Sequence, residues 1–446
     1  MVLTIGGSDS GGGAGIQADI KTFSALGLHG TSALTAITAQ NTQGVQQIYA
    51  LPPEQVRAQL ESITDDFSIA WAKTGMLHST EIVNTVADHI RSSGIPLVLD
   101  PVIEAEAGGR LLRPSAVSSL KDHLIPLAEV VTPNIFEAEA LTGIAVRDMV
   151  NAARAAGKII SLGAKAVIVK GGHLNCTDLV ADGDEIVLLP SERIEGQNHG
   201  IGCTFSAALT SFLALGYSLE NAARRAKEFA KSALRGSLKV GKGVGPVNQS
   251  AALREEASRY QVLCDLERAL DLLEKNPKLF DLLPRGGARP AMSIPGGKCL
   301  EDVAELKGGM AMMGEQICRL GGICFGGESD SAAVLLTAMK IDPRARAAID
   351  LGPDALFSCR ELGLRIMDRA LLDKLAADKG GLKSDEELSD MGAHSALQPA
   401  AIFEEGAMGK APRLYLLGAS ASSLLDLVAR MAGDEGYSRL RDDSKI

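Results

Sequence analysis

Long apolar stretches are missing from this chain of 446 residues, and a membrane protein is the first class that the sequence excludes. No uninterrupted apolar stretch approaches the length of about 18 residues that a membrane-spanning helix needs. The first residues are glycine-rich and lack a basic segment, so we also expect no signal peptide. Basic residues are outnumbered, with 45 Lys and Arg against 55 Asp and Glu. The formal net charge of −10 therefore argues against a surface for nucleic acid or for an anionic membrane.

Cysteine is also scarce, and its spacing excludes two further classes. The seven cysteines are scattered along the chain, and no two of them form a Cys-x-x-Cys pair. This usage predicts the reduced thiols of a cytoplasmic protein rather than a disulfide framework, and it predicts no structural metal. Internal repeats and low-complexity tracts are absent as well. The length still allows two or three domains with cores of their own.

Glycine is abundant, with 48 residues, and one glycine-rich segment lies close to the start of the chain. Residues 3–5 read as a short buried strand, residues 6–15 as a glycine-rich loop and residues 16–23 as a helix. The loop lacks the Gly-Lys-Ser/Thr ending of a Walker loop, and it does not match the dinucleotide fingerprint closely. Taken alone, this spacing is therefore a weak signal.

The second glycine-rich segment, His-Gly-Ile-Gly-Cys-Thr-Phe-Ser-Ala-Ala at residues 199–208, predicts an anion site. We expect a flexible loop that leads into a helix over the apolar residues 207–213. The free N–H groups at a helix N-terminus attract anions, and Gly200 and Gly202 let the backbone approach a phosphate closely. In such a setting the pKa of a thiol falls from ~8.5 to about 3.5–7.5, so we expect Cys203 to be ionised near neutral pH. The alternative is a plain glycine-rich turn with a buried cysteine.

The first 250 residues alternate short apolar strands with helices. This alternation predicts an α/β fold with a mostly parallel sheet and helices on both of its faces. Ligands bind outside the carboxyl ends of the strands in such sheets. Asp100, Asn134 and Lys170 each follow a predicted strand, so we expect them to line one crevice. The predicted strands cover residues 97–99, 130–131 and 166–169, and the predicted helices cover residues 53–64, 80–93, 115–122, 135–142 and 148–162.

Several motifs in this part of the chain together resemble the ribokinase-like superfamily and, within it, the hydroxymethylpyrimidine phosphate kinases of thiamine biosynthesis. The resemblance covers about residues 1–250. Most superfamily members have Asp where this chain has Cys203, and a cysteine there is typical of the pyrimidine kinases and of some pyridoxal kinases. A pyridoxal kinase is therefore the alternative. The motifs are Gly-Ser-Asp-Ser-Gly-Gly-Gly-Ala-Gly at 7–15, Ala-Gln-Asn-Thr at 39–42, Gly-Ile-Gly-Cys-Thr at 200–204, and residues 73–77, 100–102, 132–139 and 169–173.

The resemblance implies ATP-dependent phosphorylation of 4-amino-5-hydroxymethyl-2-methylpyrimidine and then of its monophosphate, with Mg²⁺. Cys203 would accept the hydroxyl proton as general base, a role that typically contributes ~10²–10⁴-fold. The backbone at Gly200 and Gly202 would hold the transferring phosphate, and Lys170 would neutralise its charge. Taken alone, Lys170 could equally be a solvated surface lysine.

The resemblance also implies a site for the nucleotide and Mg²⁺. Asn134 and Glu137 match the Asn-x-x-Glu motif that the superfamily uses there, and Asp100 belongs to the same group. Oxygen ligands of this kind suit Mg²⁺. The alternative is that Asn134 and Glu137 are an ordinary helix start and that Asp100 before a proline is turn chemistry.

For the substrate, the resemblance makes Gln40 the partner of the aminopyrimidine edge. Gly7, Asp19 and Met76 should line the same pocket. As alternatives, Gln40 could merely satisfy backbone groups, and Met76 could be core filler. Two histidines, at positions 173 and 199, are expected to be structural rather than catalytic.

Two positions depart from the family pattern. Ile201 replaces a threonine, which should be tolerated because the anion site uses the backbone there. Glu106 stands near the place of a lysine. Since a carboxylate is unhelpful beside phosphates, we expect this flap to sit differently or to bind nucleotide less tightly.

The character of the chain changes after residues 241–248. We predict a helical linker at residues 251–261 and a second, smaller α/β domain at residues 262–446. An apolar stripe at steps of three and four predicts one helix face across this boundary. The stripe consists of Leu253, Ala257, Tyr260, Leu263, Leu266, Leu270 and Leu273.

Residues 262–436 resemble the archaeal-type thiamine-phosphate synthase domain. The resemblance lies in the segments at 324–339 and 406–412, where Gly-Ala-Met-Gly-Lys-Ala-Pro stands. It implies thiazole phosphate or thiamine phosphate as a ligand. Backbone amides of the turn at 325–327, together with a lysine, are expected to hold a phosphate. The candidate ligand-binding residues are Gly326, Ser329, Asp330 and Lys410.

This second domain departs from active relatives at the two residues that carry its chemistry. The family's catalytic Arg and His align with Gly309 and Asp330, and a departing pyrophosphate needs positive charge nearby. Arg319 or His394 could substitute, which would leave a synthase. Otherwise the domain is an inactive relative that binds a ligand and regulates the kinase. The partners expected for the chain are these small molecules and further copies of itself as a homo-oligomer, and neither nucleic acid nor a membrane.

Overall fold

The computed structural model describes residues 1–104, 109–183, 185–284, 287–378, 400–406 and 411–433. The chain separates into two compact units, which divide between Arg254 and Glu255. Among the described residues, no helix combines the length and the apolar character needed to cross a membrane.

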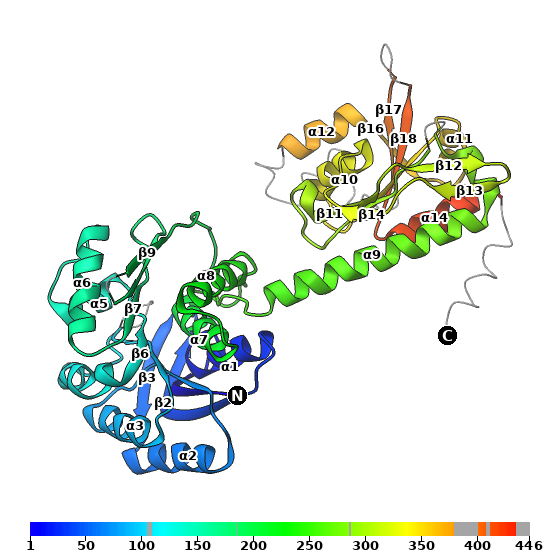
Figure 1. Ribbon diagram of the computed structural model, residues 1–446. Helices are drawn as coiled ribbons and strands as arrows, with labels where there is room; N and C mark the ends of the chain where they lie inside the picture. Colours follow the sequence, from blue (N-terminus) through cyan, green and yellow to red (C-terminus); the bar gives the residue numbers. More distant parts are fainter. Residues whose placement is uncertain (105–108, 184, 285–286, 379–399, 407–410, 434–446) are drawn as a thin grey trace. The chain divides into compact units, whose positions relative to one another are not determined.

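A nine-stranded sheet forms the centre of the first unit (Figure 1). Its strand order is β3-β2-β1-β4-β5-β6-β7-β8-β9. Neighbours from β2 to β7 pair in parallel, and β3, β8 and β9 are added antiparallel at the two edges. The prediction of a mostly parallel sheet is thus confirmed. The strands are β1 (Val2–Asp9), β2 (Gly30–Asn41), β3 (Gly44–Ala50), β4 (Trp71–Thr74), β5 (Leu97–Leu99), β6 (Ala128–Val131), β7 (Ala166–Val169), β8 (Asp178–Asp182) and β9 (Glu185–Leu189).

Helices cover both faces of this sheet (Figure 1). One apolar core lies under α2 to α6, and the other face packs against α1, α7 and α8. The helix predicted at 115–122 ends early as an α-helix, because a π-turn (Leu120–Leu124) and a 3₁₀ turn (Ile125–Leu127) follow it. The helices are α1 (Gly15–Ala25), α2 (Pro53–Asp66), α3 (Thr80–Ser93), α4 (Pro114–Ser119), α5 (Ile135–Thr142), α6 (Met149–Ser161), α7 (Ile201–Ala214) and α8 (Leu219–Arg235).

Local capping explains where several of these helices begin and end. Ser79 accepts a hydrogen bond from the amide of Ile82 at the start of α3, and Gly94 ends that helix in the left-handed conformation. At α5, Asn134 and Glu137 form a reciprocal capping box.

Helix α7 begins six residues before the apolar run that predicted it. Gly200 is its N-cap with a φ of +83°, and Cys203 therefore lies in the first helical turn and not in a preceding loop. A Cβ atom on Gly200 would collide with the carbonyl oxygen of Gly13. Glycine is required here for both reasons, because the backbone conformation and the close approach each exclude a side chain.

The second unit contains a seven-stranded sheet in the order β14-β11-β10-β15-β18-β17-β16 and a separate β12-β13 hairpin. All neighbours pair antiparallel except β16 and β17. Helices α9, α11 and α14 pack in one core, and α10 and α12 pack in another. The strands are β10 (Ala291–Ser293), β11 (Val303–Leu306), β12 (Met310–Met313), β13 (Gln316–Arg319), β14 (Ile323–Phe325), β15 (Ala347–Leu351), β16 (Arg365–Asp368), β17 (Ala400–Glu404) and β18 (Arg413–Gly418). The helices are α9 (Ala251–Lys275), α10 (Asp330–Ile341), α11 (Ala355–Glu361), α12 (Arg369–Asp378) and α14 (Ala421–Met431), with 3₁₀ turns at Pro277–Leu282 and Leu300–Asp302.

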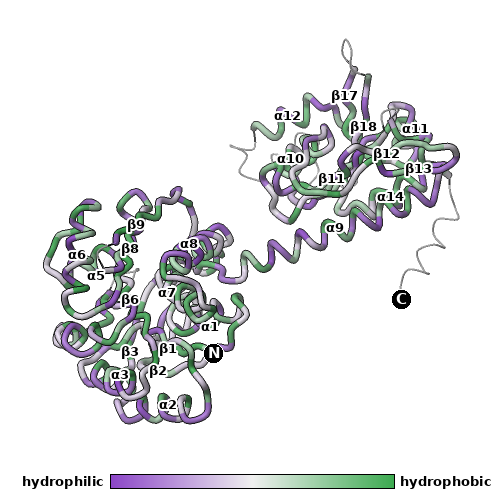
Figure 2. Tube along the Cα trace, in the orientation of Figure 1, coloured by the Kyte–Doolittle hydropathy of each residue, from purple (hydrophilic) through white to green (hydrophobic). Residues whose placement is uncertain are grey.

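Helix α9 contains the residues expected to form a linker. Figure 2 shows hydrophilic and hydrophobic segments alternating along it. The apolar stripe predicted from residue 253 onward is buried only from Leu266, because Leu253 and Tyr260 are 59% and 70% exposed and Leu263 is half-buried. The first three turns of α9 therefore contribute little to an apolar core.

Candidate active site

A cavity of about 700 Å³ lies at the carboxyl ends of the parallel strands and beside the start of α7. It contains every residue of the first unit that the sequence analysis selected. Residues from eight segments of the chain meet here, because parallel strands deliver their carboxyl ends to one edge of the sheet. The selected residues that line it are Gly7, Asp19, Gln40, Met76, Asp100, Asn134, Glu137, Lys170, Gly200, Gly202 and Cys203.

The first turn of α7 forms a candidate anion-binding corner of this cavity. Gly202 and Cys203 hold the second and third positions of the helix, where an N–H group has no acceptor within the helix. Lys170 follows β7, and its Nζ lies 3.5 Å from the position that a Cβ of Gly202 would occupy. A lysine ammonium and free amides therefore face the same small volume, as phosphate binding requires.

Lys170 is itself held by carboxylates. Its Nζ donates to Asp100 Oδ1 at 2.9 Å and lies 4.0 Å from Glu137 Oε2. Burial lowers the pKa of Lys170, but the two carboxylates outweigh burial and raise it, so this lysine is charged at neutral pH. It is mostly buried and is therefore not the solvated surface lysine of the alternative interpretation.

Asp100 is buried, and several side chains donate to it. Ser206, one turn along α7, donates to Oδ2 at 2.9 Å, while Thr132 donates to Oδ1 at 3.3 Å. Glu137 is also buried, and burial raises its pKa to about 7, with Lys170 opposing the shift. A buried carboxylate that is hard to ionise gains from an added cation. The oxygen atoms of Asp100, Asn134 and Glu137 thus fit the chemistry of Mg²⁺.

Cys203 differs from expectation in its ionisation. Burial raises the pKa of its thiol to about 11, although Lys73 and a hydrogen bond from the amide of Gly15 both lower it. The carboxylates of Asp19 and Asp100 add to the rise. The thiol is therefore protonated at neutral pH, and the expected thiolate was wrong. The field of one helix N-terminus does not compensate for the loss of water next to two carboxylates.

Asp19 lines the same cavity and is tied to Lys73. Lys73 Nζ donates to both carboxylate oxygens at 2.8 Å, and the Thr4 hydroxyl donates to Oδ2 at 2.7 Å. Sequence analysis did not select Lys73 as a functional residue. The available signal was a lysine in the strand segment Trp71–Thr74, where apolar side chains are expected.

Gly7 and Met76 pack against each other beside this pair. A Cβ on Gly7 would lie 3.1 Å from the sulfur of Met76. Met76 is only 7% exposed, so it serves as core filler and as cavity wall together.

Asp9 and His199 were not selected as site residues, yet both line the cavity. Asp9 accepts hydrogen bonds from the amides of Gly11, Gly13 and Ala14 at 2.8–2.9 Å, which closes the first glycine-rich loop. An aspartate within a run of glycines is typical of such turns, and this signal was available in the sequence. His199 joins the two glycine-rich segments, because its Nε2 lies 3.0 Å from Asp9 Oδ2.

Three other segments complete the cavity wall. His173 lines the cavity and packs edge-on against Phe136, with ring centroids 5.4 Å apart. Glu104 and Arg110 line it as well and form an isolated bridge to each other. The expectation about Glu106 lies outside the described residues.

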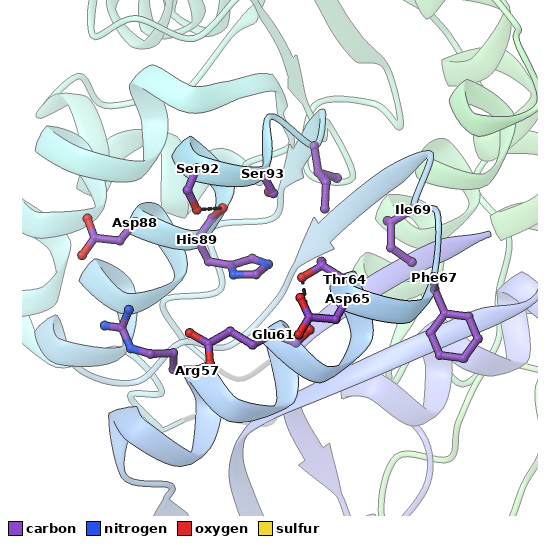
Figure 3. Close-up of a pocket in the computed structure, with 11 residues that line it drawn as sticks. Arg57, Glu61, Thr64, Asp65, Phe67, Ile69, Asp88, His89, Ser92 and Ser93 are labelled. Atoms are coloured by element: carbon purple, nitrogen blue, oxygen red, sulfur yellow. Dashed lines mark hydrogen bonds between the residues drawn. The ribbon is translucent and has the colours of Figure 1, made fainter.

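A second hollow, of about 710 Å³, lies between α2 and α3 (Figure 3). It shares no residue with the first cavity and contains none of the sequence-predicted site residues. His89 points into the space between the two helices, and its Nε2 is buried without a hydrogen-bond partner among the described residues. Burial lowers the pKa of this histidine.

In the second unit, the backbone amides of the turn expected to hold a phosphate already donate hydrogen bonds within the protein. Those of Gly326 and Gly327 donate to the carbonyl of Val303, and those of Glu328 and Ser329 donate to the Glu305 carboxylate. The expectation of an amide-lined phosphate site at this turn was therefore wrong.

Two of the remaining candidates, Ser329 and Asp330, lie at the start of α10. Ser329 is its N-cap, and Asp330 Oδ2 lies 3.5 Å from the guanidinium of Arg413. Gly309 has a φ of +72°, and a Cβ on it would lie 3.6 Å from the Arg289 side chain. Lys410 lies outside the described residues.

Arg319, one of the two proposed substitutes for the missing catalytic residues, is already paired. It contacts carboxylates of α9 at Glu267, Asp271 and Glu274. The other candidate, His394, lies outside the described residues.

Comparison with known proteins agrees with this geometry. Residues 9–248 match the family model described as phosphomethylpyrimidine kinase. The chain belongs to the phosphomethylpyrimidine kinase family. Residues 265–430 of this family member also match the model described as thiamine-phosphate synthase ThiN.

Curated relatives of this kinase-family chain share its first part. A hydroxymethylpyrimidine/phosphomethylpyrimidine kinase of Haemophilus influenzae is 51% identical over 263 residues, which is 57% of this chain and 98% of that protein. One of Streptomyces coelicolor is 46% identical over 258 residues, 57% of this chain and 96% of that protein. The thiamine biosynthesis bifunctional protein ThiED of Geobacter sulfurreducens is 45% identical over 263 residues, 58% of this chain and 54% of that protein.

Solved structures similar to this phosphomethylpyrimidine kinase family member include two pyridoxal kinases. The enzyme of Bacillus subtilis, in an ADP complex, has a TM-score of 0.53 with 39% identity and covers 56% of this chain and 98% of its own. The enzyme of Staphylococcus aureus, in complex with AMP-PCP and pyridoxal, has a TM-score of 0.52 with 37% identity and covers 56% of this chain and 93% of its own. The expected ribokinase-like fold of the first unit is confirmed.

Proposed function

We propose that the first unit phosphorylates the hydroxymethyl group of 4-amino-5-hydroxymethyl-2-methylpyrimidine and then the resulting monophosphate, with ATP as donor. One observation carries this proposal: the free amides of α7, the Lys170 ammonium, the Cys203 thiol and the Gln40 amide meet in a single cavity. The named relatives are kinases of this substrate, and they match the same part of the chain.

In the transfer, the substrate hydroxyl oxygen forms a bond to the γ-phosphorus, and the bond from that phosphorus to the bridging oxygen of ADP breaks. The amides at Gly202 and Cys203 hold the equatorial oxygens, and Lys170 balances their charge. The hydroxyl proton passes to the sulfur of Cys203 in those molecules in which this thiol is ionised. Because the pKa of this thiol is about 11, the ionised fraction is small at neutral pH and the rate should rise in alkaline solution.

Mg²⁺, when bound, neutralises charge on the phosphates, and Asp100, Asn134 and Glu137 would hold it. Asp100 and Glu137 also position Lys170, so these residues couple the cation to the phosphate-binding corner. Removal of Mg²⁺ with a chelator should abolish turnover.

Pyridoxal kinase activity is the second candidate, since both solved relatives described above are pyridoxal kinases. The deciding experiment supplies purified protein with ATP and either hydroxymethylpyrimidine or pyridoxal, and it compares kcat/KM from chromatographic product analysis. A larger value for the pyrimidine supports the main proposal, and a larger value for pyridoxal replaces it.

For the second unit, we propose a noncatalytic relative of the synthase that binds thiamine phosphate or a precursor. Gly309 and Asp330 supply no positive charge at the two positions that active relatives use, and Arg319 is paired with three carboxylates. Arg413 beside Asp330 supplies a cation near the start of α10. Calorimetric titration of the full chain with thiamine phosphate tests the binding.

A further inference from the structure

Four polar side chains, those of Asp9, Thr38, Gln40 and His199, meet at the wall of the cavity, and the hydrogen atoms that they share can be counted. His199 Nε2 lies 3.0 Å from Asp9 Oδ2 and 3.3 Å from the atom placed as Gln40 Nε2. The other end of the Gln40 amide lies 3.1 Å from the hydroxyl oxygen of Thr38. Oxygen and nitrogen of an amide group are assigned from such contacts, so the orientation of Gln40 can be derived from its neighbours.

The carboxylate of Asp9 determines whether Nε2 of His199 carries a hydrogen. This carboxylate is 3% exposed and accepts three backbone amides besides the histidine. Burial raises the pKa of Asp9, but these donors outweigh burial and hold it below its ordinary value. An ionised carboxylate only accepts hydrogen bonds, so Nε2 of His199 carries a hydrogen whether the ring is neutral or charged.

This hydrogen excludes one orientation of Gln40. An amide NH₂ placed at 3.3 Å from an N–H group would put two donors against each other. The oxygen of the Gln40 amide must therefore face His199.

The contacts of Thr38 are compatible with the same orientation. The hydroxyl oxygen of Thr38 lies 3.0 Å from the carbonyl oxygen of Ser8 and 3.1 Å from the near end of the Gln40 amide. This hydroxyl has a single hydrogen to donate. One hydrogen cannot serve both acceptors at full strength. When this hydrogen is donated to the carbonyl of Ser8, the Thr38 oxygen can only accept a hydrogen bond from Gln40. The nitrogen of the Gln40 amide then faces Thr38.

We propose, resting on the kinase function proposed above, that His199 and Thr38 fix the polarity of the Gln40 amide and thereby orient the substrate ring. With its oxygen toward His199, Gln40 accepts from the 4-amino group on that side and donates to the adjacent ring nitrogen on the Thr38 side. In this substrate the ring carbon that bears the hydroxymethyl group is the other neighbour of the amino-bearing carbon. It is thus directed toward His199 and the anion-binding corner at Gly200.

The reverse polarity would favour a different ring edge. A 4-oxo analogue presents an acceptor at position 4 and an N–H at the adjacent ring position, which is the mirror of the aminopyrimidine pattern. His199 is accordingly a positioning residue that selects an amino over an oxo substituent, because the mismatched pairing leaves polar groups unsatisfied.

The test compares 4-amino and 4-oxo forms of 5-hydroxymethyl-2-methylpyrimidine as substrates of the full chain. His199→Phe keeps a ring but removes the N–H group, and we expect the amino-to-oxo ratio of kcat/KM to fall at least ~10-fold. His199→Gln restores a side-chain donor at a similar distance and should recover most of the ratio. Thr38→Val removes the other constraint and should lower the ratio without touching His199. His123→Phe, on an exposed turn outside the cavity, is the matched control.

A purely structural role for His199 would lower both substrates equally, so an unchanged ratio in folded His199→Phe and Thr38→Val proteins overturns the inference. In that case the unmutated protein still phosphorylates the aminopyrimidine, and the proposed function stands. If the unmutated protein phosphorylates pyridoxal but neither pyrimidine, the proposed function fails and the inference fails with it.

Discussion

Lys73 donates to both carboxylate oxygens of Asp19 at 2.8 Å, with the two side chains 0% and 1% exposed. The lysine comes from β4 and the aspartate from α1, and the pair lies under the wall that carries Cys203. Burial lowers the pKa of Lys73, but the negative charges of Asp19 and Asp100 outweigh burial and raise it. A fixed positive charge is thereby held next to the thiol.

Removal of the Cys203 thiol should slow the kinase. We expect Cys203→Ala to lower kcat by at least ~10²-fold, the lower end of a general-base contribution, with little change in nucleotide binding. Steady-state kinetics and calorimetric titration with an ATP analogue measure the two effects. Cys264→Ala, on α9 of the second unit, is the control. Near-normal turnover in folded Cys203→Ala protein would remove the thiol from the chemistry and leave the amides as the main contributors.

Loss of the Lys73 charge should make Cys203 harder to ionise. The pKa of this thiol is about 11, so its alkylation should accelerate as pH rises toward that value. Lys73 lowers the pKa, and Lys73→Met should therefore shift the alkylation curve to higher pH, with labelling at pH 9 reduced ~10-fold. Mass spectrometry of the Cys203 peptide after iodoacetamide treatment measures this.

The single Lys73 variant leaves the buried Asp19 without an opposite charge, which typically costs ~3–5 kcal/mol. The paired variant Asp19→Asn with Lys73→Met removes both charges and should fold better. Lys73→Arg keeps the charge and should keep the alkylation curve of the unmutated protein. A curve that is the same for Met and Arg at this position contradicts the assigned electrostatic role.

Gln40 should discriminate between substrates and leave the nucleotide unaffected. Gln40→Leu removes both the donor and the acceptor that pair with the aminopyrimidine edge, so we expect kcat/KM for hydroxymethylpyrimidine to fall ~10²-fold while KM for ATP stays nearly the same. Gln43→Leu, an exposed position just beyond the same strand, is the control. Equal losses for pyrimidine and ATP would speak against a substrate contact.

His89 should make the first unit less stable in acid. Burial lowers its pKa in the folded protein below the value of ~6.5 expected in the unfolded chain. Below that pH the unfolded chain binds a proton that the folded protein resists, so the free energy of unfolding falls as pH drops. His89→Leu should flatten this decline, whereas His123→Leu should not.

Urea unfolding followed by Trp71 fluorescence measures the effect, because this is the single tryptophan of the sequence and it lies in the first unit. If the pH dependence is as steep in His89→Leu as in the unmutated protein, the assigned role of His89 is wrong.

The second unit should form little thiamine phosphate as it stands. Pyrimidine diphosphate, thiazole phosphate and Mg²⁺ supplied to the full chain should give almost no product, because Gly309 and Asp330 themselves carry no positive charge. Gly309→Arg with Asp330→His should increase synthesis at least ~10-fold, although a side chain at a φ of +72° costs ~1 kcal/mol or more.

Gly314→Arg is the matched control, since Gly314 has a φ of +67° in the β12-β13 hairpin and open space around it. Robust synthesis by the unmutated chain would show that this unit is an active synthase. Absence of calorimetric binding of thiamine phosphate would remove the ligand-binding role as well.

Elements whose limits are set by neighbouring residues could be predicted from the sequence. The helices at 80–93 and 135–142 and the strand at 166–169 agree with the structure residue for residue. For both helices the reason is local, because a capping side chain begins each one and a left-handed glycine ends it. The meeting of Asp100, Asn134 and Lys170 in one cavity was also predictable, since parallel strands share a carboxyl edge.

Features that depend on distant parts of the chain were decided only by the tertiary structure. The start of α7 at Ile201 depends on the close approach of Gly200 to Gly13, which no local pattern reports. The amides of the 325–327 turn donate hydrogen bonds to strand β11, which lies about twenty residues earlier in the sequence.

Cys203 shows most clearly which properties are determined by the sequence and which by the tertiary structure. Its type and its place at a glycine-rich helix start were determined by the sequence, and these predicted an ionised thiol. Burial is the main cause of its raised pKa, and Lys73, Asp19 and Asp100, from β4, α1 and the position after β5, modify the shift. Burial and charge act through space, so the sequence alone specifies which groups are available, and the packing of the sheet decides which of them lie close enough to shift a proton equilibrium.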